Sequence, residues 1–413
     1  MKFVDCQGLA GAWSLGSVQA GLELVHRCSL PGGFGDEVMD ANRHLLGDGW
    51  AQEVGLQDEW TPQEIDFLCG TPPCSGFSLL NRSKGSNFRG VDSPINGCMK
   101  ELVAYAARCW GPDGRRGAPI AAFESVQGAY TEGRPLMQAL RQKLEDDTGE
   151  RYLLTHVKMS GASIGAAQFR KRYFPVFHRV PFGVDRPDES LLPDGRIVTY
   201  RDAIGDLAGA KLQWEDQRYP KKPKSTFAAV RRREDGRFSD HMPLDYRAKA
   251  SVIDEVDRRG WLPGEGLQHA CVRLGFRPPA FEKSYLPDEN KYKGFNWPRR
   301  VNPDRCGYVL TGSSGQFIHW EEARSLTVRE CSRLMGYPDS WVWPTDRHKI
   351  AAAQIGKCCP VDSGRWLSSF ARRSLEGDPG TDQVEIGYRE RFHDSTNVYK
   401  RYPGADVPPL KRP

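Results

Sequence analysis

Short apolar runs alternate with segments of helical periodicity along the first 180 residues. Four runs have the length and apolar character of buried strands: KFVDC (2–6), ELVHRCSL (23–30), IDFLC (65–69) and PIAAF (119–123). The segments between them include two helix candidates, WSLGSVQAGL (13–22) and NGCMKELVAYAARCW (96–110). Strands that alternate with helices predict an α/β fold with a doubly wound, mostly parallel sheet. In such sheets ligands bind at the carboxyl ends of the strands.

The pattern weakens after residue 183 and returns near residue 323. Residues 184–320 are rich in Pro, Gly, Arg and Trp and show little periodicity. Residues 323–373 regain helical spacing, and Thr327 and Glu330 stand in the relation of a capping box. WLSSFARR closes a last helix, and the Gly-, Pro- and charge-rich segment 375–413 is expected to be a flexible extension.

Composition narrows the class of protein. With 413 residues the chain is long enough for two or three domains. It has eleven cysteines without a CxxC pair, which disfavours a zinc ribbon and indicates free thiols in a reducing compartment. The N-terminus does not resemble a signal peptide, and no stretch of 18 apolar residues exists. We therefore expect a cytoplasmic protein without a membrane span.

Charge adds a mild indication of a polyanionic partner. The net charge is +5, and between Lys211 and Arg247 ten Lys and Arg face six Asp and Glu, a local excess of 10 − 6 = +4. The runs KKPK (221–224) and RRR (231–233) concentrate this excess. They are typical either of a solvated loop or of a face that binds phosphates.

Three short segments carry candidate chemistry. In CGTPPCSGFS (69–78), two prolines stiffen the turn that leaves a strand and hold Cys74 at the ligand-binding edge. Taken alone, Cys74 is as well explained as a small buried residue. Glu124 ends the strand PIAAF, where it either caps a helix or performs proton chemistry. In AAQFRKRYFPVF (166–177) a strand would place Gln168, Arg170 and Arg172 on one face.

The order of these segments resembles the DNA (cytosine-5) methyltransferase family. A glycine-rich first turn, PPC, a strand-terminal Glu and QxRxR follow one another as in that family. RSLTVRECSRLMGYPD (324–339) and AAQIGKCCPV (352–361) are similar to two later family segments. The resemblance covers about three quarters of the chain, and the DCQG, PGGFG and ESV variants look most like members encoded by bacteriophages.

The resemblance implies roles for the residues that match the motifs. Cys74 would attack C6 of a flipped-out cytosine, Glu124 would act at N3, and Arg172 with Arg170 would hold the base carbonyl. The segment 75–92 would be a loop that closes over the base. Contacts to double-stranded DNA are expected from eight further residues: Ser78, Arg82, Gln168, Arg231, Arg232, Arg233, Arg299 and Arg300.

The expected cofactor is S-adenosyl-L-methionine, although the motifs that would bind it depart from the family pattern. The candidate residues are Asp5, Gly8, Gly11, Glu53, Pro72 and Lys357. DCQGLAG is one residue shorter before its glycines than the family turn, and either Asp36 or Glu37 would take the place of the acid at the ribose. Ser125 and Lys357 stand where the family has asparagine.

The resemblance also implies the domain organisation. We expect a Rossmann-like S-adenosylmethionine-dependent methyltransferase fold whose catalytic domain begins with 1–183 and is completed by 321–374. An irregular, β-rich target recognition domain would occupy 184–320. We expect a monomeric enzyme that methylates DNA, in phage DNA modification or anti-restriction. An RNA cytosine-5 methyltransferase and a DNA-binding homologue with impaired catalysis are the alternatives.

Overall fold

The computed structural model describes eight stretches of the chain: 1–32, 35–78, 90–179, 196–244, 250–275, 298–312, 317–376 and 390–395. They form two compact units. The first comprises Met1–Ala166, Arg170–Gly195 and Cys358–Asp406. The second comprises Ala167–Phe169, Arg196–Lys357 and Val407–Pro413.

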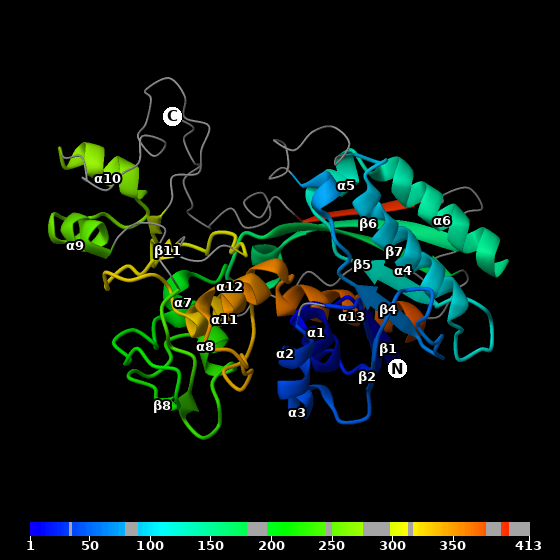
Figure 1. The fold of residues 1–413 in the computed structure, drawn as a ribbon, viewed down its shortest axis with the longest axis horizontal. Coiled ribbons are helices and arrows are strands. Elements are labelled where there is room, and N and C mark those ends of the chain that lie inside the picture. The colour runs from blue at the N-terminus through cyan, green and yellow to red at the C-terminus, as the bar shows by residue number, and fades with distance from the viewer. Residues whose placement is uncertain are drawn as a thin grey trace. The chain divides into compact units, whose positions relative to one another are not determined.

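The first unit is built on one sheet (Figure 1), with strand order β12-β6-β7-β5-β4-β1-β2-β3. All neighbours are parallel except that β7 runs antiparallel to β5 and β6. The strands are β1 (Lys2–Cys6), β2 (Glu23–Ser29), β3 (Ala51–Val54), β4 (Phe67–Gly70), β5 (Ile120–Phe123), β6 (Tyr152–Ser160), β7 (Lys171–Arg179) and β12 (Glu390–Ser395). This confirms the predicted α/β class with a doubly wound, mostly parallel sheet.

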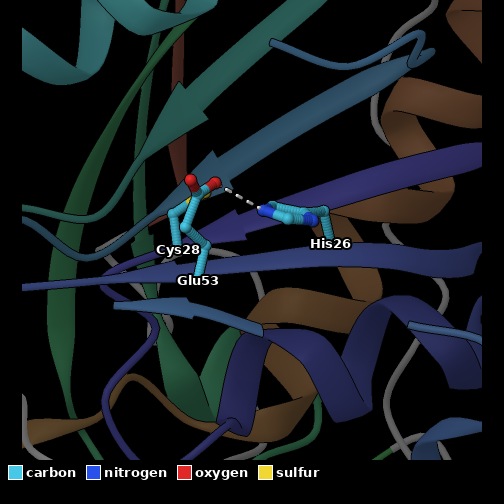
Figure 2. Close-up of side chains that lie close together, drawn as sticks. All are labelled: His26, Cys28 and Glu53. Carbon is cyan, nitrogen blue, oxygen red and sulfur yellow. Dashed lines mark hydrogen bonds and ion pairs between the residues drawn. The ribbon is translucent and has the colours of Figure 1, made fainter. Parts of the chain in front are cut away.

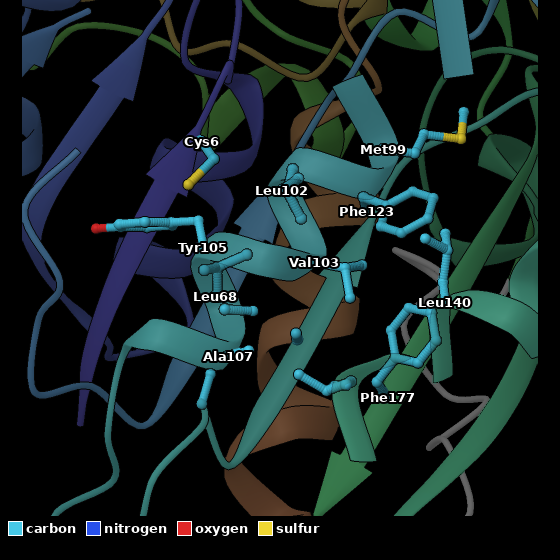
Figure 3. Close-up of a cluster of buried hydrophobic side chains, with 14 of the residues drawn as sticks. Cys6, Leu68, Met99, Leu102, Val103, Tyr105, Ala107, Phe123, Leu140 and Phe177 are labelled. Atoms are coloured by element: carbon cyan, nitrogen blue, oxygen red, sulfur yellow. The ribbon is translucent and has the colours of Figure 1, made fainter. Parts of the chain in front are cut away.

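Helices cover both faces of this sheet because its central strands are apolar on both sides. On β4, Leu68 packs into a core with α4 (Gly97–Arg108) and α6 (Arg134–Thr148), shown in Figure 3. Phe67 points to the other face, where its ring lies 6.4 Å from that of Trp13. Trp13 belongs to α1 (Ala12–Gln19), which packs on α13 (Val361–Glu376).

Glycine makes the approach of α1 to α13 possible. A Cβ at Gly16 would lie 2.4 Å from the carbonyl oxygen of Val361, and one at Gly364 would lie 2.8 Å from Cα of Trp13. No larger residue fits this contact without a shift of backbone. The remaining helices of the first unit are α2 (Asp36–Ala41), α3 (Arg43–Leu46) and α5 (Gln127–Thr131).

The second unit is irregular, and its described residues contain short elements. Its helices are α7 (Tyr200–Ile204), α8 (Thr226–Ala229), α9 (Ala250–Arg258), α10 (Leu267–Arg273), α11 (Val328–Leu334) and α12 (His348–Lys357). Two strand pairs accompany them, β8 (Gln217–Arg218) with β9 (Arg237–Phe238) and β10 (Arg299–Arg300) with β11 (Phe317–Ile318). The predicted capping box of Thr327 and Glu330 is present at the start of α11.

Three features differ from the sequence interpretation. The strand predicted over 166–177 begins only at Lys171, so Gln168, Arg170 and Arg172 do not share one strand face. The second unit extends through Lys357, so the segment 321–374 is divided between the two units. Within the extension expected to be flexible, residues 390–395 form β12 beside β6. Within the described part of the chain, no helix is long and apolar enough to cross a membrane.

Candidate active site

The carboxyl edge of β4 presents Cys74. The turn after Gly70 holds Pro72 buried and Pro73 exposed, and Cys74 then starts the short 3-10 turn Ser75–Phe77. The thiol is half-buried, and burial raises its pKa to about 11. Glu124 acts in the same direction, whereas Arg172, Arg170 and the backbone N–H of Val126 lower the pKa of this thiol.

Glu124 reaches the same edge from β5. Its backbone N–H donates to the carbonyl oxygen of Gly70 at 2.8 Å, which ties the two strand ends together. Ser125 and Tyr173 then exchange two backbone hydrogen bonds, of 2.8 and 3.0 Å. Because β7 is antiparallel, this pairing brings the first residues of β7 to the carboxyl ends of β4 and β5.

Two arginines complete the group. Arg172 forms an ion pair through Nε with the Glu124 carboxylate, and their side chains are 15% and 3% exposed. Arg170 is buried, and its burial together with the nearby charge of Arg172 lowers its pKa to about 9. The structure therefore brings all four predicted catalytic residues, Cys74, Glu124, Arg170 and Arg172, into one electrostatic cluster.

Sequence reasoning missed Cys359, which joins this cluster from the last motif. Its thiol is buried, and burial, followed by the charge of Glu124, raises its pKa well above the usual range. Arg170 and Arg172 oppose that rise, so the thiol lies within the field of the same charged groups. The only available signal was its place in QIGKCCPV, directly before Pro360.

The first turn, after β1, has a strained and crowded backbone. Gly11 has φ 73°, but Gln7 and Leu9 also adopt left-handed φ values of 57° and 52°, which L-residues rarely hold. A Cβ at Gly8 would lie 1.9 Å from the Asp5 carboxylate, so a larger residue there would have to displace this buried side chain. Asp5 is buried and accepts a hydrogen bond from the Ser14 hydroxyl. Asp5 and Gly8 therefore contribute to the backbone conformation of the turn by close packing inside it.

This turn suits a polar ligand. Gln7 is buried, and among the described residues neither its amide nitrogen nor its amide oxygen has a hydrogen-bond partner. A buried amide without partners is costly, so a ligand with donors and acceptors at this edge would satisfy it. The residues of the turn therefore fit the expected cofactor.

Arg27, which sequence reasoning also missed, supports the turn from β2. Its guanidinium donates to the carbonyl oxygen of Leu9 at 3.0 Å and to Asp36 Oδ1 at 2.9 Å. The Ser29 hydroxyl donates to the other oxygen of Asp36 at 3.1 Å. Of the two acids left open as ribose ligands, Asp36 is fixed at the end of β2, whereas Glu37 is exposed.

The other cofactor candidates have different surroundings. Glu53 accepts hydrogen bonds from the Thr61 N–H at 2.9 Å and the Thr61 hydroxyl at 3.2 Å, and its Oε2 lies 3.0 Å from His26 Nε2. Pro72 is buried within the turn that leads from β4 to Cys74. Lys357 is an exposed residue at the end of α12 in the second unit.

The residues predicted to contact DNA separate into buried and accessible groups. Gln168 is buried in the second unit, where its amide donates to the Leu334 carbonyl at 2.9 Å. Arg231 is buried and donates to the carbonyls of Gly336 and Phe227. Arg300 is buried and binds Asp257 and the Trp320 carbonyl. These contacts give the three side chains structural partners inside their own unit.

The other five candidates are partly accessible or lie outside the described residues. Arg232 stacks on the Tyr219 ring at 3.6 Å, and Arg233 pairs with Asp216 and Asp235. Arg299 donates to the Tyr308 hydroxyl at 3.1 Å. Ser78 is half-buried at the end of its turn, and Arg82 lies outside the described residues, as does most of the predicted loop 75–92.

The second unit contains a buried ion-pair network around α11 that the motif alone did not reveal. Arg333 is bound by Asp206 and Asp339 at 2.6 and 2.5 Å. Arg329 pairs with Asp240 at 2.6 Å. The network also contains Arg324, whose guanidinium forms two 2.8 Å hydrogen bonds with Glu330.

Three known families or proteins that the chain resembles in sequence are cytosine or type II methyltransferases. The family model for C-5 cytosine-specific DNA methylase matches residues 121–368, which is 248 of 413 residues. The chain is 25% identical over 405 residues to the type II methyltransferase M.XorII of Xanthomonas oryzae, covering 91% of this chain and 85% of that protein. It is 25% identical over 345 residues to DNA (cytosine-5)-methyltransferase 4 of Arabidopsis thaliana. That match covers 72% of this chain. The chain spans only about a fifth of the length of the plant relatives that it matches.

Two solved structures share the fold. One is a DNA modification methyltransferase encoded within a prophage (E. coli), with TM-score 0.64, 18% identity, and coverage of 91% of this chain and all of that one. The other is the Dnmt2 methyltransferase of S. pombe, with TM-score 0.51, 14% identity, and coverage of 91% and 98%. The family model matches more than half of the chain, and the chain therefore belongs to the C-5 cytosine-specific DNA methylase family.

Proposed function

We propose that this chain transfers a methyl group to C5 of a flipped-out cytosine in double-stranded DNA. The observation that carries the proposal is the convergence of Cys74, Glu124, Arg170 and Arg172 at one edge of the sheet. Enzymes of this family use S-adenosylmethionine, which when bound supplies the methyl group. The turn of Gln7, Gly8 and Gly11, with Asp36 at the start of α2, would hold it.

The charges around Cys74 define how the thiol would be activated. In the free protein, burial and the Glu124 carboxylate keep the thiol protonated at neutral pH. When Glu124 engages a protonated cytosine N3, its negative charge no longer opposes the thiolate, and Arg172 and Arg170 favour it. Sulfur would then bond to C6 while the thiol gives up its proton and N3 holds one, so that the number of protons is unchanged. After methylation at C5, loss of the C5 proton would restore the double bond between C5 and C6 and expel Cys74 as a thiolate. N3 would then lose its proton and the thiol would regain one.

Arg172 and Arg170 would orient the base. A guanidinium presents a planar fork of donors that fits a carbonyl oxygen, and a buried one keeps its orientation. Cytosine in a duplex cannot reach a half-buried thiol, so the base must leave the stack. The exposed run KKPK (221–224) in the second unit supports a phosphate-binding face for the duplex.

A role in protecting DNA from cleavage is the biological setting that we propose. The bacterial relatives M.XorII and M1.HgaI are type II methyltransferases, and this chain covers 85% and 76% of their lengths. The prophage origin of one structural neighbour is consistent with the phage origin suggested by the DCQG, PGGFG and ESV variants. The modified cytosine could equally be a precursor for a further modification.

One experiment tests substrate, activity and target together. The chain is expressed in a host without DNA methylation, and 5-methylcytosine is mapped by bisulfite sequencing. We expect methylation at a fixed sequence context and none in cells that express Cys74→Ala. Methyl transfer from labelled S-adenosylmethionine to duplex DNA and to RNA is measured in parallel. Label in RNA alone would overturn the DNA substrate, and label with Cys74→Ala equal to wild type would overturn the mechanism.

A further inference from the structure

Strands β2 and β3 place three metal-binding types of side chain on one face of the sheet. Cys28 lies in register with Glu53 on β3, and paired residues of parallel strands point to the same side. His26 precedes Cys28 by two positions and therefore shares this face. Arg27, between them, points to the opposite face, where it supports the first turn. The His26, Cys28 and Glu53 side chains are thus separate from the Arg27 and Asp5 cluster.

The three side chains already lie close together (Figure 2). One ligand atom from each, a nitrogen, a sulfur and a carboxylate oxygen, lies within 4.8 Å of the other two. His26 Nε2 and Glu53 Oε2 are 3.0 Å apart. Metal–ligand bonds of about 2.0–2.3 Å in a tetrahedral site separate ligand atoms by roughly 3.3–3.7 Å. Binding would therefore need His26 and Glu53 to move apart slightly and the most distant ligand atoms to approach by roughly 1 Å.

Neighbouring groups hold these ligands in position. Thr61 donates from both its backbone and its hydroxyl to the Glu53 carboxylate. The Tyr105 hydroxyl lies 3.6 Å from the Cys28 sulfur and donates to the Thr61 carbonyl at 3.0 Å. Outer contacts of this kind orient the ligands of metal sites. His26 and Cys28 are buried, while the Glu53 side chain is 27% exposed, which leaves a side for an ion to enter.

We propose that His26, Cys28 and Glu53 form a binding site for a zinc-like divalent cation. A thiolate, an imidazole nitrogen and a carboxylate oxygen are the donors that Zn²⁺ takes in proteins, whereas Mg²⁺ and Ca²⁺ prefer oxygen alone. Binding replaces the hydrogen bond between His26 and Glu53 by two bonds to the ion. The ion takes Cys28 as the thiolate and His26 as the neutral imidazole, so a proton held by this pair is released to solvent on binding.

Cobalt(II) is the probe for the test, because a thiolate bound to it gives a charge-transfer absorption band. The full-length protein is treated with a chelator and titrated with Co²⁺, then with Zn²⁺. We expect one equivalent of Co²⁺ to produce the band and Zn²⁺ to abolish it. Cys28→Ser should lose the band, and His26→Gln and Glu53→Gln should each weaken binding by about tenfold or more.

Two variants control for binding by other thiols. Cys74 and Cys98 are the two cysteines that are not fully buried, so Cys74→Ala and Cys98→Ser should keep the band. Loss of the band in either one, or an unchanged band in Cys28→Ser, would overturn the proposal. Thermal unfolding without metal shows which variants fold. If Cys28→Ser does not fold, the partly exposed Glu53→Gln decides: affinity equal to wild type overturns the site.

Discussion

Two buried groups of arginines and carboxylates, one in each unit, differ in how completely the charges are paired. Around α11, Arg333 is held by two carboxylates and by the Ala203 carbonyl, and its side chain is fully buried. At the edge of β5, Arg172 pairs with Glu124 and stays 15% exposed. An arginine whose donors are all bound by carboxylates and carbonyls contributes to stability. An arginine with fewer partners has donors left that can bind a substrate. The same residue types therefore serve structure in one unit and candidate chemistry in the other.

The largest expected effect lies at Cys74. Replacing it with alanine removes the sulfur that would bond to the base, so we expect methyl transfer to fall by more than about 10⁴-fold. Cys69 is the matched control, because it is buried in the same segment and reaches no base in the proposed mechanism. Cys69→Ser should retain most activity. The readout is incorporation of labelled methyl groups into duplex DNA, and comparable losses in the two variants would contradict the assignment.

The α11 network should show its effect in stability. Arg333→Met leaves the buried carboxylates of Asp206 and Asp339 without their main partner, so we expect the free energy of unfolding to fall by about 3–5 kcal/mol. Chemical denaturation measures this change. Arg201→Met is the control, because the Arg201 pair with Asp304 is exposed and should contribute at most about 1 kcal/mol. Equal losses of unfolding free energy in Arg333→Met and Arg201→Met would contradict the stabilising role of the buried network.

Arg172→Met should lower activity strongly and the free energy of unfolding only slightly, the reverse of Arg333→Met. Loss of a charged donor beside the reacting base is expected to lower kcat by about 10²–10³-fold. Stability should change less than in Arg333→Met, since Arg172 is partly exposed and its ion pair is with one carboxylate. Single-turnover kinetics and denaturation of the same preparation give both values. A large loss of stability with a normal kcat in Arg172→Met would contradict this prediction.

The smallest predicted effect concerns pH. Because the pKa of Cys74 is raised to about 11, the thiolate fraction of the free protein is small at neutral pH and grows as pH rises. In the free protein, the rate at which iodoacetamide alkylates Cys74 should therefore increase by up to about tenfold per pH unit between about pH 7 and 9, because the thiolate is the nucleophile. Mass spectrometry of the alkylated protein measures this rate. An alkylation rate that is already constant at pH 7 would contradict the raised pKa.

The sequence predicted the strands well because their patterns depend on local apolar character. β1 matches its predicted range, and β2, β4 and β5 begin or end within two residues of theirs. The meeting of the four candidate catalytic residues at one sheet edge was also predictable, since Cys74 and Glu124 follow β4 and β5 and Arg170 and Arg172 lie at the start of β7. Arg27, Cys359 and the partners of Arg333 were not, because their contacts are with residues of other elements that only the folded chain brings close.

The arginines at 231–233 and 299–300 show a related limit of sequence reasoning. A run of basic residues has the same appearance whether its side chains face solvent or bind carbonyls inside the fold. Arg231 and Arg300 proved to be buried, whereas the neighbouring run KKPK is exposed. Lysine is rarely buried, so the lysine run was the better sequence indicator of an accessible basic surface.

The three residues Ala167–Phe169 belong to the second unit although they lie between segments of the first. Gln168 donates to the Leu334 carbonyl, and the Phe169 N–H donates to the Gly307 carbonyl. A chimera that exchanges only 196–357 would replace both acceptor segments but keep the donors. Transplanting this module between homologues therefore calls for a graft of two pieces, the long insertion and its three-residue counterpart upstream.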